Sequence, residues 1–272
     1  MLRRTLMMAL IAILTVGCGE ESPGSKGEEL VQPSPPQTGT LHFVANGEGF
    51  AVEPFESKDG WTIDLDHVYI SFDEVTGYLT DPPFDPHGSE EMRYTSREVL
   101  AGSCIVDLAD GPVRVGSVDD AQAGHYNATS WLNVPSDGGP SEGFSVLLVG
   151  TATKADALIE FSLGVAQSYR YLGGEYVGGE RKGLLRPGEE AELEMTFHLD
   201  HIFGTAELPP QDQLNADAIG FQAFADIAEE GRLETTLAEL EGKLPEDEFG
   251  LLSEALRTLG HVGEGHCRCT VM

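Results

Sequence analysis

Positive charge is scarce in this chain. Its 272 residues include 16 Lys and Arg against 46 Asp and Glu, which gives a formal net charge of −30 at pH 7 with histidine neutral. So acidic a surface repels the phosphates of nucleic acids and the anionic faces of membranes. The composition therefore argues against nucleic acid as a partner and favours cations. A simpler interpretation is also open, because acidic surfaces keep proteins soluble in salty media.

Long hydrophobic runs are missing as well. One apolar run, LMMALIAILTV at residues 6–16, follows two arginines and is too short to span a bilayer as a mature helix. A charged start, a short apolar run and a small residue are typical of a secretory signal. Cys18 after Gly17 resembles a bacterial lipobox, although Thr15 stands where leucine is usual. The sequence thus predicts lipidation of Cys18; ordinary cleavage nearby, with Cys18 an incidental thiol, is the alternative.

The segment after Cys18 has little to bury. Residues 19–40 are rich in Glu, Ser, Pro, Gly and Gln, a composition typical of a disordered spacer. The expected organisation is a membrane-anchored lipoprotein of the periplasm or cell surface. Its parts are a signal peptide (1–17), a lipidated disordered tether (18–39), a β-sandwich (40–210) and a helical segment with a His/Cys tail packed on the sandwich (211–272).

Cysteine is rare, with four in the chain. If Cys18 carries lipid, then Cys104, Cys267 and Cys269 remain, and an exported compartment favours a disulfide. Cys267 and Cys269 are poor partners for each other because so short a ring strains disulfide geometry. The sequence therefore predicts a bond from Cys104 to the tail, to Cys267 or Cys269, with Cys267 as the expected partner.

Familiar catalytic motifs are also absent. The chain has no Walker loop, no G-x-S-x-G elbow, no H-E-x-x-H and no Rossmann fingerprint. With so many acids, chance pairs of carboxylates are expected and no glycosidase dyad can be identified. The sequence gives no positive indication of an enzyme.

Apolar and polar residues alternate over much of residues 40–200, as in strands that bury one face. WTIDL (61–65) and VYISF (68–72) alternate in opposite phase, which predicts a bulge or corner at Asp66-His67. AELEMTFHLD (191–200) is expected to turn its leucines, Met195 and Phe197 inward and its polar side chains outward. Strands at this spacing, with Gly and Pro turns, predict a mainly β fold, an antiparallel β-sandwich.

The periodicity becomes helical after residue 212. Pro245 followed by three acidic residues is typical of a helix start, and Gly260 of a helix end. Three short helices are therefore expected, with these apolar stripes: Ile219, Phe221, Phe224 and Ile227; Leu233, Leu237, Leu240 and Leu244; Phe249, Leu252, Leu256 and Leu259.

Half of the eight histidines fall in two short clusters, each with a carboxylate. FHLDHIFG contains His198, Asp200 and His201, and GHVGEGHC contains His261, Glu264 and His266. Imidazole and carboxylate are ligands for borderline divalent ions, so the clusters predict a shared Zn or Cu site. His198 and His201 can converge only if the strand ends near Asp200. Extra ligands are expected at the bulge, from His67 and Asp66. Each cluster also has a structural interpretation, as a polar strand end bonded to backbone and an exposed tail.

The same segments resemble known sequences. H-x-DHIFG together with a GHVGEGHC ending is similar to secreted bacterial lipoproteins of unknown function, and this implies a periplasmic or surface lipoprotein without implying an activity. Cys269 is additional to that pattern. VDLADGPVRVGS (106–117) with AGHYNATSWLNV (123–134) resembles prealbumin-like secreted sandwiches, which implies a β-sandwich.

The leading functional hypothesis is a lipid-anchored, non-enzymatic protein that captures, buffers or delivers Zn or Cu. The alternative is an adhesion or assembly module that binds a protein or glycan without metal. That alternative predicts distant histidines and an exposed aromatic patch around Tyr169, Tyr171 and Tyr176. A third hypothesis, an enzyme with the metal as Lewis acid, needs an open coordination position in a cleft.

Overall fold

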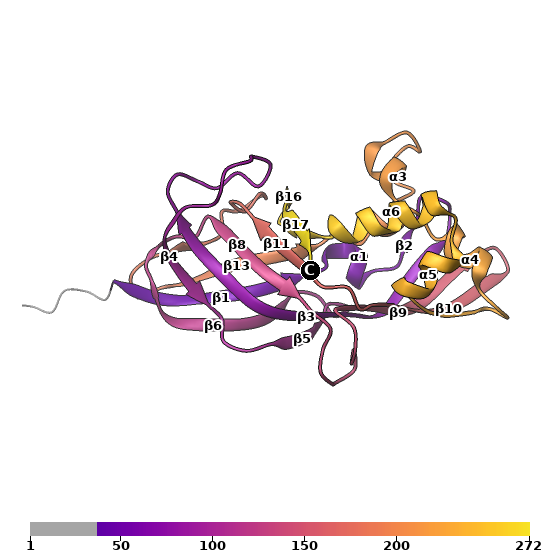
Figure 1. The fold of residues 1–272 in the computed structure, drawn as a ribbon, viewed down its shortest axis with the longest axis horizontal. Coiled ribbons are helices and arrows are strands. Elements are labelled where there is room, and N and C mark those ends of the chain that lie inside the picture. The colour runs from indigo at the N-terminus through magenta and orange to yellow at the C-terminus, as the bar shows by residue number, and fades with distance from the viewer. Residues whose placement is uncertain (1–36) are drawn as a thin grey trace, which may run out of the picture. The chain divides into compact units, whose positions relative to one another are not determined.

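The computed structural model describes residues 37–272 (Figure 1). The predicted signal peptide, Cys18 and most of the predicted tether lie outside the described residues. Strand β1 (Thr38–Asn46) already begins within the last residues of the predicted tether. None of the described helices has the length and apolarity needed to cross a membrane.

The smaller of two main sheets has the strand order β16-β15-β13-β1-β6. Its members besides β1 are β6 (Val113–Gln122), β13 (Glu190–Phe197), β15 (Gly260–Val262) and β16 (Gly265–His266). β1 and β13 run parallel, and the other pairs are antiparallel. Residues 260–266 of the C-terminal tail are therefore part of this sheet and extend its edge with two strands.

The larger sheet has the order β14-β10-β9-β3-β8-β11-β17. These strands are β3 (Thr62–Thr80), β8 (Ala128–Asn133), β9 (Val146–Lys154), β10 (Ala157–Val165), β11 (Tyr169–Gly173), β14 (Arg232–Thr236) and β17 (Arg268–Val271). Three short strands also pair with β3, namely β2 (Phe55–Glu56), β4 (Tyr94–Val99) and β5 (Cys104–Asp107). A separate pair joins β7 (Gly124–His125) to β12 (Leu184–Leu185).

The predicted irregularity at Asp66-His67 is confirmed. WTIDL and VYISF belong to the single long strand β3, whose register with β9 shifts between Leu65 and His67. The extra residue at the bulge shifts the alternation by one position. Ile63 before the bulge and Val68 and Ile70 after it are therefore all fully buried.

The two sheets face each other, and the mainly β, sandwich-like fold is confirmed. Phe197 of β13 packs edge-on against Phe72 of β3 at 5.6 Å and against Trp131 of β8 at 6.1 Å between ring centroids. The sheets are mixed rather than wholly antiparallel, since β10 and β14 also run parallel. The expected outward face of β13 is not exposed: Glu194 and Thr196 are buried as well, because the tail strands and the neighbouring loops cover them.

The helices of the described residues are α1 (Glu48–Val52), α2 (Asp200–Phe203), α3 (Gln213–Asp217), α4 (Gln222–Ile227), α5 (Leu237–Lys243) and α6 (Glu246–Arg257). Of these, α4 and α5 pack on the end of the larger sheet at β10 and β14, whereas α3 contacts α2 and α6 and stands away from the sheet (Figure 1). The helix start near Pro245 is confirmed. The helical stripe from Leu233 is wrong in its first part, because residues 232–236 pair with β10 as β14. Gly260 lies in β15 instead of ending a helix.

The predicted disulfide is not formed, because Cys104, Cys267 and Cys269 are all free thiols. Cys104 in β5 and Cys269 in β17 lie on opposite sides of three intervening strands. The register partners that separate them are Phe72, Asn133 and Tyr169. Neighbouring strands are about 4.8 Å apart, so this separation exceeds the roughly 7 Å between Cα atoms that a disulfide can bridge.

Candidate metal centre

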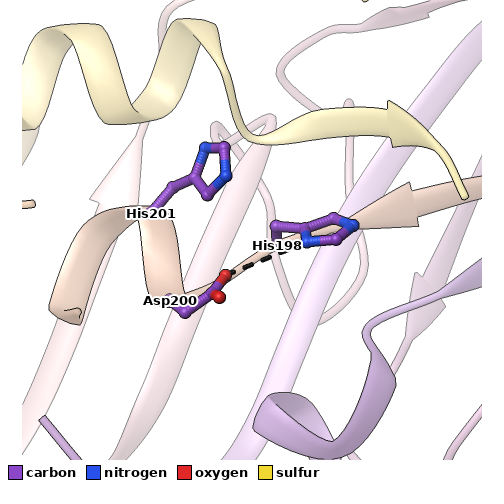
Figure 2. Close-up of side chains that lie close together, drawn as sticks. All are labelled: His198, Asp200 and His201. Atoms are coloured by element: carbon purple, nitrogen blue, oxygen red, sulfur yellow. Dashed lines mark ion pairs between the residues drawn. The ribbon is translucent and has the colours of Figure 1, made fainter. Parts of the chain in front are cut away.

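The end of β13 turns directly into a short helix, and this turn positions the first histidine cluster. β13 ends at Phe197 and α2 begins at Asp200, with the His201 N–H donating to the His198 carbonyl at 3.1 Å. The predicted condition for convergence is thus met: the chain leaves the extended conformation before Asp200. Figure 2 shows the three side chains close together, and the rings of His198 and His201 are 5.7 Å apart between centroids.

A tight hairpin positions the second cluster. Val262 pairs with Gly265 across a two-residue turn, and His261 pairs with His266 in the next position, with ring centroids 4.5 Å apart. Gly263 occupies the turn with φ +60°, a conformation that favours glycine in a hairpin turn. A Cβ there would also lie 2.0 Å from the Val177 carbonyl oxygen. The spacing H-x4-H is therefore the spacing of two facing residues around a two-residue turn.

The two segments meet in space. β15 pairs with β13, which places His261 opposite Thr196, and the His198 N–H donates to the Leu259 carbonyl at 3.0 Å. His261 stacks on His198 with ring centroids 4.2 Å apart and meets His201 at 4.9 Å. His266 lies 6.0 Å from His201. Four imidazoles from two parts of the chain therefore form one cluster.

These separations suit a shared ion. A zinc-bound imidazole nitrogen lies about 2.0–2.1 Å from the metal, so the ring centroid lies roughly 3.2 Å from it. Two imidazoles on one tetrahedral ion then have centroids about 5 Å apart, and about 6 Å at wider angles. One ligand atom each from His198, Asp200 and His201 already lies within 4.8 Å of the others. The rings of His198 and His261 are stacked 4.2 Å apart between centroids, which is closer than two ligands of one tetrahedral ion, so the His261 ring has to turn before it can join His198, Asp200 and His201 as a ligand.

Hydrogen bonds orient two of the rings. His198 Nε2 lies 3.2 Å from the Gly263 carbonyl oxygen, which can only accept, so Nε2 carries a proton and Nδ1 is the nitrogen that remains for an ion. His201 Nδ1 lies 3.0 Å from Thr258 Oγ1, whose hydroxyl donates to the Glu254 carbonyl. Nδ1–H of His201 therefore donates and Nε2 is free to ligate. Such outer hydrogen bonds are the usual means of orienting metal-binding histidines.

Carboxylates face Nδ1 of His198. Its Nδ1 lies 3.9 Å from Asp200 Oδ1 and 3.9 Å from Glu48 Oε2. Burial raises the pKa of both carboxyl groups, while the nearby His198 acts in the opposite direction. Glu264 is exposed, and its negative charge also raises the pKa of Asp200 and of Glu48. Glu48 was not predicted from the sequence, because it lies far from both histidine clusters and no motif marks it.

The centre is buried and short of internal partners. His261 is 2% exposed, and neither of its ring nitrogens has a hydrogen-bond partner among the described residues; the same holds for Oδ1 of Asp200, which is 8% exposed. Burial lowers the pKa of His261 to about 2 and that of His201 to about 4, with the charge of His198 acting in the same direction. Burial also lowers the pKa of His266. These imidazoles are neutral at pH 7, the form that binds metals.

One histidine predicted as an extra ligand lies elsewhere. His67 stacks on Tyr69, and its Nδ1 lies 2.7 Å from Asp107 Oδ2, so the structure pairs it with β5 instead of the cluster. His87, which the sequence gives no reason to select, lies with its ring 6.1 Å from that of His266. The adhesion hypothesis predicts distant histidines and an exposed patch around Tyr169, Tyr171 and Tyr176. In the structure four of the histidines lie together, Tyr169 and Tyr171 are buried, and Tyr176 is half-buried.

A cavity of about 330 Å³ adjoins the cluster. His201 and His266 line it together with Thr258 and residues of α3 and α6, among them Asp217 and Glu254. The cavity thus reaches the cluster at these two histidines, and its acidic side chains suit a cation.

Comparisons with protein-family models, with curated proteins and with solved structures gave no match.

Proposed function

We propose that the protein binds one divalent transition-metal ion, Zn(II) or Cu(II), through His198, His201, His261, His266 and Asp200, and that it captures, buffers or delivers this ion. The single observation that carries the proposal is the clustering of four imidazoles, two of them beside the buried Asp200, in which His261 has no hydrogen-bond partner among the described residues. Burying a polar nitrogen without a partner costs roughly 1–3 kcal/mol. Coordination of a cation would offset this cost.

The donor set supports a borderline ion. Imidazole nitrogens and a carboxylate suit Zn(II) and Cu(II), whereas thiolates would favour Cu(I). Cys267 follows His266 in the chain, but its sulfur packs beside Gly173, and burial raises its pKa well above the ordinary value. A neutral thiol in an apolar contact is a poor ligand, so we assign the ion to the imidazoles and Asp200.

The first 18 residues extend the proposal to location. The short apolar run and the Gly17-Cys18 pair favour a lipid anchor at the periplasmic or cell-surface side of a membrane. There, a chain with net charge −30 would raise the local concentration of cations, and the histidines would select among them. Glu264 and Glu48 contribute negative charge beside the ion without a direct ligand role in this proposal.

Elemental analysis of the purified full chain, after exposure to equimolar Zn and Cu, tests the proposal. We expect about one ion per chain in the wild type and none above background in a His261→Ala/His266→Ala variant, because two of the imidazole ligands are lost. His67→Ala is the matched control, since it removes an exposed histidine outside the cluster. Circular dichroism checks that each variant is folded.

Two results would contradict the proposal. Equal metal content in the wild type and the double variant would show that the ion, if any, sits elsewhere. Loss of metal in His67→Ala with retention in the double variant would move the site to the β3 bulge.

A further inference from the structure

The loop between β3 and β4 brings a fifth histidine to the edge of the centre. The His87 ring lies edge-on to that of His266, with centroids 6.1 Å apart, and both side chains are exposed. His266 in turn lies 4.5 Å from the buried His261. The imidazoles therefore form a continuous series that runs from solvent at His87 to the buried side of the cluster at His198.

This loop is held in place by the tail strand. The Arg268 guanidinium donates to the backbone carbonyls of Pro86 at 3.3 Å, Glu90 at 3.5 Å and Gly88, and it lies 5.1 Å from the ring centroid of Phe84. Arg268 stands two residues after His266. The segment that supplies the exposed ligand thus also fixes the loop that carries His87.

On the basis of the metal binding proposed above, we infer that His87 and His266 form an outer receiving site for the divalent ion, from which the ion passes to the buried ligands. A centroid separation of 6.1 Å falls at the upper end of the about 5–6 Å at which two imidazoles share one ion. In the transfer, the bond from the metal to the His87 nitrogen breaks and a bond to a His261 nitrogen forms, while His266 stays bound. An imidazole binds the ion through an unprotonated nitrogen, so the exchange of His87 for His261 trades one imidazole ligand for another.

The exchange has a kinetic consequence. A hydrated ion that entered the buried cluster directly would lose its water ligands before it gained imidazoles, whereas stepwise exchange replaces ligands one at a time. His87 then lowers the barrier for loading and for release by the same factor, and it leaves the affinity unchanged because it does not bind the ion in the final state. A permanent fifth ligand would instead change the affinity.

Rapid mixing with Co(II), a visible substitute for Zn(II), tests this inference on the full chain. Loading is followed by the absorbance of the bound ion, and release by excess EDTA at several concentrations extrapolated to zero. We expect His87→Ala to slow both rates about ten-fold, within the range over which mutants of one site vary in association rate, with Kd within about two-fold of the wild type. His67→Ala is the exposed-histidine control and should change neither rate.

A second variant checks the role of the loop. Arg268→Gln should slow loading and release as His87→Ala does, and the His87→Ala/Arg268→Gln double variant should be no slower than the slower single variant, because both act on one step. Unchanged rates in His87→Ala would overturn the inference, as would a weaker Kd at an unchanged loading rate, or equal slowing in His67→Ala. A wild type that binds no Co(II), Zn(II) or Cu(II) would instead refute the proposed function itself.

Discussion

His261 is the residue on which the centre depends most, and its surroundings explain why. The side chain is 2% exposed, contacts three other imidazoles and has no hydrogen-bond partner among the described residues for either nitrogen. His198 and His201 differ from it, because each uses one nitrogen to donate to a fixed acceptor, the Gly263 carbonyl and Thr258 Oγ1. Two rings are therefore oriented by the protein, and the third is oriented by the ion in our proposal.

Thr258 offers a test of that orientation without removing a ligand. Its hydroxyl accepts from His201 Nδ1–H and donates to the Glu254 carbonyl. We expect Thr258→Val to weaken Zn(II) binding by roughly 10–100-fold, the usual cost of losing an outer hydrogen-bond partner, with stoichiometry unchanged. Competition with a chelator of known affinity measures the change.

Thr153→Val is the control for the threonine substitution, because Thr153 is an exposed residue of β9. An affinity in Thr258→Val equal to that in Thr153→Val would mean that the ion does not use His201 Nε2 in the way proposed here.

The elements show which parts of this arrangement a sequence can predict. The alternation in AELEMTFHLD identifies β13, and the reversed phase around His67 identifies the bulge, because both depend on burial of neighbouring residues within one strand. Pro245 and the acids after it identify the start of α6 by local chemistry. The clustering of histidines also indicates the segments of the candidate metal centre, since four of the proposed ligands come in two short motifs.

Other features depend on partners far apart in the chain and left no local signal. Glu48 reaches His198 only because α1 packs near the end of β13. Leu233 fits a helical stripe, but pairing with β10 makes residues 232–236 a strand, so a tertiary partner overrides the local pattern. The distance from Cys104 to the tail likewise depends on the strand order of the sheet, and the spacing of cysteines in the sequence gives no information on that order.

The β15–β16 hairpin is the element that brings the second pair of histidines into position. Gly263 is required at its turn, with φ +60° and a carbonyl 2.0 Å from where a Cβ would lie. We expect Gly263→Ala to lower the free energy of unfolding by about 1–3 kcal/mol, from backbone strain and displacement of Val177, and to weaken metal binding. Denaturant unfolding and metal titration measure the two effects.

Gly242→Ala is the matched control for this substitution. Gly242 lies in α5, and a Cβ there meets nothing within 4 Å, so alanine should leave stability equal or raise it by up to about 1 kcal/mol. If Gly263→Ala were as stable as Gly242→Ala and bound metal equally, the turn would not be what fixes His261 and His266.

At the scale of the whole molecule, the candidate centre brings together segments that lie far apart in the sequence. The proposed ligands come from the end of β13, from α2 and from the tail strands of the smaller sheet, and His201 also contacts Thr258 at the end of α6. An ion bound there would crosslink the tail to the sandwich in a protein that has no disulfide among the described residues. Metal binding should therefore be coupled to global stability.

This coupling gives a quantitative prediction. A ligand that binds only the folded state at 100 times its Kd adds about 2.7 kcal/mol to the free energy of unfolding, which corresponds to a rise in Tm of roughly 5–10 °C for a domain of about 230 residues. We expect that rise when Zn(II) is added to the EDTA-treated wild type, measured by differential scanning calorimetry, and none in the His261→Ala/His266→Ala variant. Because a chain of net charge −30 is also stabilised by any cation that screens its self-repulsion, Mg(II) at equal concentration serves as the control. Equal rises with Mg(II) and Zn(II), or an undiminished Zn(II) effect in the double variant, would assign the stabilisation to general screening of the acidic surface instead of to the histidine centre.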